Sequence, residues 1–363
     1  MNIEELLQLT VEKGASDLHL TVPSPPVLRI DGVLRPLKEL PGVTPEYTKQ
    51  ALEHLTTKSQ RERFYNELEL DLAYDVPKLA RFRVNAFFQQ GTITIAIRRI
   101  PLEAPYIDKL ELPSACKTLA LKTKGLVLVT GPTGVGKSTT LAAMINHLNK
   151  NDTRNVITIE DPIEYVYQND KCIISQRELG ADFKSFSVAL RYTLRHDPDV
   201  ILVGEMRDLD TIATAITAAE TGHLVLSTVH TASAPQTIER LIDVFPAHQQ
   251  QQIRFQLSQA LEGVLSQRLL PRAGGKGRVA AFEIMLSTDA IRNCIREGRT
   301  DQIYTYLQMG KQYGMQTMDQ ALGALVKSGT VTLEEALTRS RNRDELHELS
   351  KLAESIDVLA LEA

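Results

Sequence analysis

The sequence predicts an α/β protein built around a P-loop nucleotide-binding core, with a small α+β domain ahead of it. The first observation is VTGPTGVGKSTT at residues 129–140, which matches the phosphate-loop template G-x-x-x-x-G-K-[ST] at each fixed position. The second is that strand and helix patterns alternate from about residue 114, which is typical of a parallel sheet. The third is a pair of hairpin signals within the first hundred residues, which indicates antiparallel strands there.

Length and composition narrow the class of protein. A chain of 363 residues suits two domains, and a net charge of −4 does not favour a general nucleic-acid binder. Cys116, Cys172 and Cys294 are far apart and form no C-x-x-C pair, so we expect neither a disulfide framework nor a zinc site. The N-terminus is too charged for a signal peptide, and no apolar run approaches the roughly 20 residues of a membrane span. These features predict a soluble, cytoplasmic protein that binds no zinc and no nucleic acid.

The first domain is expected to span residues 1–100. Its expected elements are a helix at 2–14, a strand at 16–22, a hairpin at Asp31-Gly32, a helix from Pro45 to about Leu55, and strands at 81–88 and 92–97 around Gln90-Gly91. Pro101, Pro105 and Pro113 then punctuate a stretch that we interpret as a linker over residues 101–113. The second domain is expected to span residues 114–363.

Four apolar runs predict the strands of the second domain: 125–130, 155–160, 199–203 and 223–229. Beyond residue 235 the pattern is mostly helical. From Arg339 onwards the chain is rich in charge, and we expect marginal order there.

The strand–loop–helix context of the phosphate loop predicts a site for ATP. Glycines let backbone N–H groups point at phosphate oxygens, and the start of the helix adds positive potential. Lys137 is expected to reach the outer phosphates, and Ser138 to hold Mg²⁺ through its hydroxyl. A glycine-rich turn without a ligand is the simpler alternative, but the complete spacing argues against it. The expected ATP-binding residues are Gly131, Pro132, Thr133, Gly134, Val135, Gly136, Lys137, Ser138 and Thr139.

Carboxylates follow the strand at 155–160. Glu160, Asp161 and Glu164 stand together, and mutual repulsion disfavours this unless a cation or a reacting water uses them. We assign Glu164 as the general base that activates the attacking water, and expect Glu160 and Asp161 to shape the loop or hold Mg²⁺ through water. A solvated acidic turn is the alternative.

The apolar strand at 199–203 is followed by Gly204 and Glu205, the position of a Walker B carboxylate. An aspartate near Mg²⁺ is usual there. Glu205 has a longer side chain, so we expect it to act on the metal through a bound water. Arg207 and Asp208, which come next, more simply form an ion pair.

Arginines and histidines give further candidates. Arg191 and Arg195 are four residues apart, so on a helix they would share a face and could either reach phosphates or form a surface salt-bridge face. His223 and His230 flank the fourth strand and fit no metal spacing. Thr228 and His230 lie at the end that should face the γ-phosphate. We therefore expect His230 to take part in catalysis, and Thr228 and His223 to sense the nucleotide.

Together these segments resemble the secretion ATPase superfamily, the hexameric motors of type II secretion and type IV pili. The Asp box of that superfamily is similar to residues 158–164, its Walker B to 201–205 and its His box to 222–231. The resemblance extends from residue 16 nearly to residue 343. It implies a PAS-like N-terminal domain, a RecA-like P-loop NTPase core, a homohexameric ring, and ATP sites between the two domains.

The resemblance also gives the first domain a part in catalysis. Arg83 matches a position from which an arginine reaches the γ-phosphate, and Arg81 and Arg98 are weaker candidates. A strand-borne arginine beside a hairpin is usually only solvent-facing, so the resemblance alone supports this role.

Within the superfamily, the chain resembles the ATPases that retract type IV pili. Assembly and export ATPases usually carry an extra N-terminal domain and a four-cysteine zinc module, for which three cysteines do not suffice. Residues 290–297, AIRNCIRE, are similar to the A-I-R-N-L-I-R-E motif of the retraction ATPases, with Cys294 in place of leucine. Pilus assembly, type II secretion and the accessory paralogue of the retraction ATPase remain alternatives.

The resemblance implies partners and a location as well. The expected partners are the inner-membrane platform protein of the pilus and a paralogous retraction ATPase, with the ring attached peripherally to the inner membrane at the pilus base. In the motif, Ile291, Cys294 and Ile295 have helical spacing and should pack on the core. Arg292, Asn293 and Arg296 are expected on the other side of that helix, where replacing the arginines would leave the fold intact.

Overall fold

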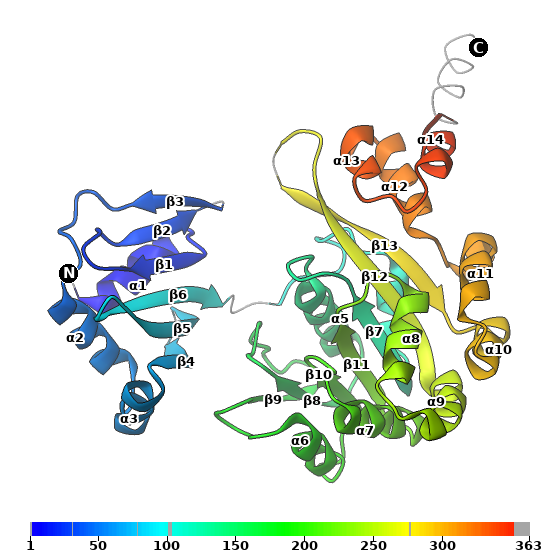
Figure 1. The fold of residues 1–363 in the computed structure, drawn as a ribbon, viewed down its shortest axis with the longest axis horizontal. Coiled ribbons are helices and arrows are strands. Elements are labelled where there is room, and N and C mark those ends of the chain that lie inside the picture. The colour runs from blue at the N-terminus through cyan, green and yellow to red at the C-terminus, as the bar shows by residue number, and fades with distance from the viewer. Residues whose placement is uncertain (1, 31, 78, 101–103, 276, 352–363) are drawn as a thin grey trace. The chain divides into compact units, whose positions relative to one another are not determined.

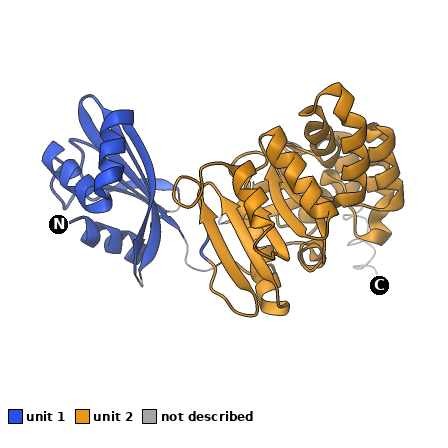
Figure 2. Ribbon diagram, turned by 90° about the horizontal axis from the view of Figure 1, so that it is seen from below, with its two compact units in different colours: residues 1–103, 164–166 blue, residues 104–163, 167–363 orange. Residues whose placement is uncertain are grey.

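The structure is a computed structural model that describes residues 2–30, 32–77, 79–100, 104–275 and 277–351. The chain divides into two compact units (Figure 2). Unit 1 comprises residues 1–103 together with 164–166, and unit 2 comprises residues 104–163 and 167–363. Each unit has a sheet and a hydrophobic core of its own.

Unit 1 is a six-stranded sheet in the order β3-β2-β1-β6-β5-β4, with each neighbouring pair antiparallel. Its main core packs α1 and α2 against the sheet through side chains such as Leu6, Leu52 and Phe82. The two predicted hairpins and the two predicted helices are confirmed, whereas α3 and β4 were not predicted. The elements are α1 (Ile3–Glu12), β1 (Asp17–Leu20), β2 (Val27–Ile30), β3 (Val33–Pro36), α2 (Pro45–Leu55), α3 (Lys58–Glu67), β4 (Glu69–Val76), β5 (Ala80–Gln89) and β6 (Thr92–Ile100).

Unit 2 is built on a seven-stranded sheet in the order β13-β12-β7-β11-β10-β8-β9 (Figure 1). The strands are parallel except for β13, which is antiparallel to β12. The strands are β7 (Gly125–Thr130), β8 (Asn155–Glu160), β9 (Ile173–Glu178), β10 (Val200–Val203), β11 (Leu224–Val229), β12 (Leu261–Pro271) and β13 (Arg278–Leu286). The four predicted strands are therefore confirmed as β7, β8, β10 and β11.

Helices cover both faces of this sheet, which is why its central strands are continuous apolar runs. One core includes α4 and α5, and the other includes α6 to α11. The helices are α4 (Ser114–Ala120), α5 (Lys137–Asn151), α6 (Phe186–Thr193), α7 (Leu209–Glu220), α8 (Ala234–Asp243), α9 (Ala247–Ala260), α10 (Asp289–Glu297), α11 (Ile303–Met309), α12 (Met318–Lys327), α13 (Leu333–Leu337) and α14 (Arg343–Lys351). None of the helices in the described ranges has the length and apolar character needed to cross a membrane.

The expectation of a mostly helical chain beyond residue 235 was wrong for residues 261–286. There β12 pairs with β7 on one side and with β13 on the other, so a long hairpin extends the parallel sheet. The helices α12 to α14 pack on this hairpin through a separate small core that includes Leu270 and Val279 (Figure 1). Of the stretch from Arg339 onwards, residues 343–351 form α14, and the expected marginal order stays a prediction there. Residues 352–363 of that prediction lie outside the described residues.

Candidate nucleotide site

The phosphate loop connects the end of β7 to the start of α5, as its sequence predicts. Gly131, Gly134 and Gly136 have φ angles of 142°, 83° and 90°, a region that L side chains rarely adopt. A Cβ on Gly131 would lie 2.5 Å from the backbone oxygen of Gln267, so this glycine is also required by close packing. The loop therefore has the backbone conformation and the position at a helix N-terminus that suit phosphate binding.

Gln267 on β12 supports the phosphate loop through hydrogen bonds of its side-chain amide. Its Nε2 donates to the carbonyl of Val135 at 2.7 Å, and its Oε1 accepts from the hydroxyl of Thr140 at 2.7 Å. Thr130, just before the loop, donates to the hydroxyl of Ser266 at 3.0 Å. Sequence reasoning missed Gln267, because its strand was not predicted. Two adjacent polar residues, Ser266 and Gln267, within an apolar stretch were the available signal.

Lys137 is buried and reaches the tip of β11. Its Nζ donates to the carbonyls of Gly131 and Pro132 at 2.8 and 3.0 Å and lies 3.3 Å from Nδ1 of His230. The Nε2 atom of His230 in turn lies 3.3 Å from Oε1 of Glu205. If Nδ1 accepts a hydrogen bond from the ammonium group, the ring proton sits on Nε2, facing the carboxylate. His230 thereby bridges the phosphate-loop lysine and the Walker B glutamate.

Burial and charge act in opposite directions within this group. Burial lowers the pKa of Lys137, and the negative charge of Glu205 offsets part of that effect. Burial alone would raise the pKa of Glu205, but the hydrogen bond from Arg207, the interaction with His230 and the charge of Arg207 outweigh it, so the pKa is lowered. Arg207 lies 2.7 Å from Oε2 of Glu205. Arg207 thus pairs with Glu205, whereas Asp208 caps α7 by accepting from the backbone of Thr211.

The two other residues of the fourth strand have different surroundings. The hydroxyl of Thr228 donates to the carbonyl of Gly204 at 2.6 Å and so joins the ends of β11 and β10 beside Glu205. His223 precedes β11, where its carbonyl accepts from the backbone of Gly125, the first residue of β7. This is the end of the parallel sheet opposite the phosphate loop. The sensor role expected of His223 is therefore not supported, because the strand separates it from the site.

The three acidic residues at the end of β8 have different environments. Glu160 is buried and accepts from the hydroxyl of Thr158 at 2.6 Å and from Gln176 at 3.3 Å. Asp161 and Glu164 are exposed, and Glu164 belongs to the short stretch grouped with unit 1. Glu160 therefore shapes the end of β8, which agrees with the first of the two roles expected for it. The role of Glu164 as the base stays a prediction.

The arginine pair on α6 does not form as expected. The helix ends at Thr193, so Arg195 lies in the following turn and stacks on the ring of Tyr192 at 5.5 Å. Arg191 remains on the helix, with its Nε 3.3 Å from the carbonyl of Ser187. Pro198 explains the early end, because the residue before a proline avoids helical backbone, and Asp197 has a φ of 51°.

In unit 1 the candidate arginines form ion pairs across the sheet. Arg83 on β5 lies 3.5 Å from Asp71, and Arg98 on β6 donates to Asp17 at 2.9 Å. Arg81 lies 3.3 Å from Asp75. These pairs hold the guanidinium groups on the sheet, and a role at the phosphate stays a prediction.

The segment 290–297 lies on α10, and its apolar residues Ile291, Cys294 and Ile295 are buried as predicted. Arg292, however, is not a free surface residue. It donates to the carbonyls of Ser258 and Gln259 at the end of α9, both at 2.8 Å, and to Glu262 at 2.8 Å. Within the described part of the chain, the polar contacts of Arg296 are with Asn293 and Glu297 of its own helix. The bonds of Arg292 do not support the expectation that it is a free surface residue, and the effect of replacing either arginine on the fold stays a prediction.

We predict that Gln267→Ala weakens ATP binding while the chain still folds. A hydrogen bond contributes about 0.5–1.5 kcal/mol, so losing the bonds to Val135 and Thr140 should lower affinity roughly tenfold. Calorimetric titration with ATP and Mg²⁺ measures this. Gln256→Ala is a matched control, because Gln256 is a partly exposed residue on α9 whose side chain donates to Glu220, far in sequence from the phosphate loop. Equal ATP affinities for the two variants would contradict the role of Gln267.

Comparison with known proteins assigns the family. The model of the type II/IV secretion system protein family matches residues 2–338. The chain is 48% identical to the type IV pilus retraction ATPase PilT of Pseudomonas aeruginosa, over 94% of this chain and 98% of the relative. It is 42% identical to the type IV pilus ATPase PilU of the same organism, over 98% of this chain and 93% of the relative. The crystal structure of the pilus retraction motor PilT with bound ADP superposes with a TM-score of 0.90 at 48% identity, covering 96% of this chain and 99% of that chain. The phosphate loop with Lys137, His230 and Glu205 thus lies on a RecA-like core, and the chain belongs to the type II/IV secretion system protein family.

Proposed function

We propose that this chain is an ATPase that powers the retraction of type IV pili, and hence twitching motility. The observation that carries the ATPase part is the line of contacts from Lys137 through His230 to Glu205. These contacts connect Lys137, which is proposed to bind the outer phosphates, with Glu205, which is proposed to hold the metal. Both residues lie at the phosphate loop.

The residues present fit ATP and Mg²⁺. The cradle at Gly131 leaves no room for a Cβ, and the hydroxyl of Ser138 and the carboxylate of Glu205 are the hard oxygen donors that Mg²⁺ prefers. When bound, Mg²⁺ neutralises charge that develops on the phosphates. Ser138 and Glu205 would hold it, Glu205 through a water. Because the pKa of Glu205 is lowered, it remains ionised and suits this role better than that of a base.

The remaining roles follow from the same chemistry. Glu164 accepts the proton of the attacking water, and Arg83 in unit 1 stabilises charge on the γ-phosphate. His230 and Thr228 respond to the nucleotide because they lie beside Lys137 and Gly204. Arg191 is retained as a weaker candidate for contact with phosphate. Arg195 is not retained, because it stacks on Tyr192 beyond the end of α6.

Retraction is favoured over pilus assembly and secretion by α10 and by similarity. Residues 290–297 carry the motif that resembles the retraction ATPases, and the identity to PilT, 48%, exceeds that to PilU, 42%. We propose that the chain works as a homohexamer on the inner-membrane platform protein of the pilus, with a paralogous ATPase as a further partner. On this proposal, it is a cytoplasmic protein attached to the inner membrane at the pilus base.

The experiment that tests the function is deletion of the gene in its host. Cells should still extend pili but should fail to retract them and to twitch, and the wild-type gene should restore both. Cells that lack the gene and assemble no pili would instead support an assembly ATPase. Normal retraction would contradict the proposal.

A further prediction separates the two arginines of α10. Arg292→Ala removes three charge-assisted hydrogen bonds and should lower the thermal midpoint by at least several degrees. Arg296→Ala should change stability by less than about 0.5 kcal/mol, because its contacts lie within its own exposed helix face. Differential scanning calorimetry measures both.

Arg296→Ala and Asn293→Ala are therefore the clean tests of the retraction motif. Both variants should keep ATPase activity in a phosphate-release assay but abolish twitching in complemented cells. Normal twitching with both would refute the assignment of this motif to retraction and leave the ATPase assignment intact.

A further inference from the structure

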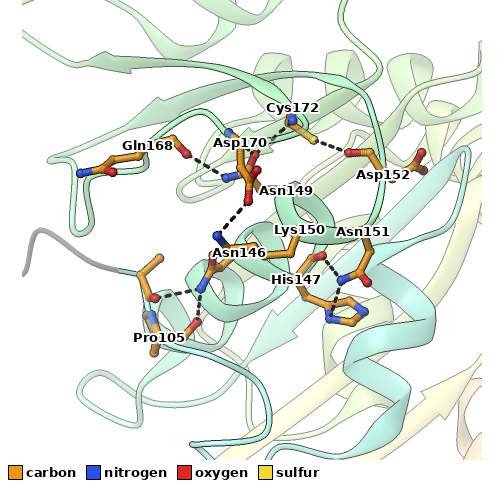
Figure 3. A network of polar contacts seen from close by, with 11 residues as sticks. Pro105, Asn146, His147, Asn149, Lys150, Asn151, Asp152, Gln168, Asp170 and Cys172 are labelled. Carbon is orange, nitrogen blue, oxygen red and sulfur yellow. Dashed lines mark hydrogen bonds and ion pairs between the residues drawn. The ribbon is translucent and has the colours of Figure 1, made fainter.

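The phosphate-loop helix α5 binds two stretches of chain that follow the residues of unit 1 closely in sequence. Unit 1 contains residues 1–103 and 164–166. Within unit 2, residues 104–105 follow the first stretch and residues 168–172 follow the second shortly after. Figure 3 shows polar contacts from the second half of α5 to both.

Asn146 holds the first of these stretches. Its Nδ2 donates to two successive carbonyls, those of Ala104 at 2.9 Å and Pro105 at 3.0 Å (Figure 3). Only 8% of the residue is exposed. Both hydrogens of the side-chain amide are thereby used, and both bonds end on the backbone, so they fix the path of the chain whatever the side chains are.

Asn149, one turn later on the same face, holds the second stretch. Its Nδ2 donates to the carbonyl of Gln168 at 2.8 Å, and its Oδ1 accepts from the backbone of Asp170 and of Cys172, both at 3.1 Å (Figure 3). The residue is 3% exposed. Next to it, Lys150 pairs with the carboxylate of Asp170 at 2.8 Å.

A third asparagine on the same helix provides a contrast. Asn151 is exposed and donates to the carbonyl of His147 at 2.6 Å, which lies one turn back on α5 itself (Figure 3). Asparagine is a poor helix former. Its presence at two buried positions of α5 is therefore explained by the chain segments that Asn146 and Asn149 bind, and not by the helix.

We propose that Asn146 and Asn149 are positioning residues that couple the phosphate loop to the two chain segments leading from unit 1. Asn146 and Asn149 lie nine and twelve residues beyond Lys137 on one rigid helix, or about 14 and 18 Å along its axis. Phosphates bind at the start of that helix. A shift of α5 in response to nucleotide would thus move both segments together, and by reciprocity their position would affect nucleotide affinity. This inference rests on the proposed function, because it names residues that transmit the nucleotide state.

The simpler alternative is that both asparagines only stabilise unit 2. Their replacement would then lower the unfolding temperature and leave the response to nucleotide unchanged. The two interpretations differ in whether the distance between the units still changes with the nucleotide when the asparagines are replaced.

The test measures the distance between the two units in full-length protein with ADP and with a non-hydrolysable ATP analogue. Spin labels are placed by Leu34→Cys in unit 1 and Met309→Cys in unit 2, which are 51% and 75% exposed, whereas Cys116, Cys172 and Cys294 are buried. Labelled chains are diluted into unlabelled ones, and double electron–electron resonance gives the distance distribution. We expect the mean distance to differ between the two nucleotides.

The expected result is that Asn146→Ala and Asn149→Asp lose this difference, while Asn151→Ala keeps it. Asn149→Asp retains an oxygen that accepts from Asp170 and Cys172, but it replaces the donor to Gln168 with a carboxylate oxygen that repels this carbonyl. A thermal melt of each variant selects the temperature at which the protein is folded for the distance measurement. The inference is overturned if both variants bind nucleotide and shift as the wild type does, if Asn151→Ala loses the shift equally, or if the wild type does not shift. Phosphate release from ATP by the wild type is measured in parallel on unlabelled protein from the same preparation. Its absence would refute the proposed function, whereas an unchanged shift in hydrolysing protein would refute this inference alone.

Discussion

Replacing Lys137 with alanine is expected to abolish ATP binding. Lys137 is the only cation within the phosphate loop, residues 131–138, and its ammonium group is buried among the loop carbonyls beside His230. Without it, the outer phosphates would meet the carbonyls of Gly131 and Pro132 with no nearby compensating charge from the loop. Calorimetric titration with ATP and Mg²⁺ should show no binding at concentrations that saturate the wild type.

The control for Lys137→Ala is Lys117→Ala. Lys117 is a partly exposed lysine on α4 that pairs with Asp108, and a surface pair of this kind contributes about 0–1 kcal/mol. A thermal melt of both variants shows whether the fold is intact. Near-normal ATP affinity of folded Lys137→Ala protein would exclude the role given to this residue.

The second large effect is expected for Glu164→Gln, which should bind ATP normally and barely hydrolyse it. An amide cannot accept the proton of the attacking water, and loss of a general base costs about 10²- to 10⁴-fold in rate. The measurement is phosphate release at saturating ATP, together with an affinity titration.

Glu205→Gln distinguishes the base from the metal-holding carboxylate. Glu205 is paired with Arg207 and His230, and its lowered pKa makes it a weak proton acceptor. We expect Glu205→Gln to raise the Mg²⁺ concentration needed for activity, whereas Glu164→Gln should not respond to added Mg²⁺. Turnover of Glu164→Gln within a few-fold of the wild type would mean that another group is the base.

Short-range patterns predicted the centre of the site, because a phosphate loop needs particular residues at fixed spacing. Gly131, Lys137 and Ser138 are recognisable for that reason, and the apolar runs of β7 and β11 follow from burial on both faces of the sheet. Gln267 was missed because it lies more than 120 residues from the loop that it supports, and local pattern cannot encode such a pairing. The hairpin of β12 and β13 was missed for the same reason, since its pairing with β7 outweighs local propensity.

Other predictions from the sequence failed because they misjudged where a helix ends or which residues a side chain contacts. The turn that places Arg195 beyond α6 could have been read from Pro198, which disfavours helix before it. The bonds of Arg292 to the end of α9 could not, because a sequence shows the face of a helix but not its neighbours. The sensor role expected of His223 did not take account of the direction of the chain, because His223 precedes β11 and the phosphate loop lies at the carboxyl ends of the parallel strands.

The strand β12 serves two distant parts of unit 2 at once. Gln267 supports the phosphate loop, and three residues further on Leu270 is buried against the C-terminal helices α12 to α14. The helices α12 to α14 therefore cannot be removed without affecting the hairpin. Ending the chain after β13 would expose Leu270, Val279 and Ala281 to water on the very hairpin that steadies the loop. A shortened protein designed to isolate the motor core would thus expose apolar side chains that promote aggregation. A loss of ATP affinity in that protein could not be attributed to the missing helices alone.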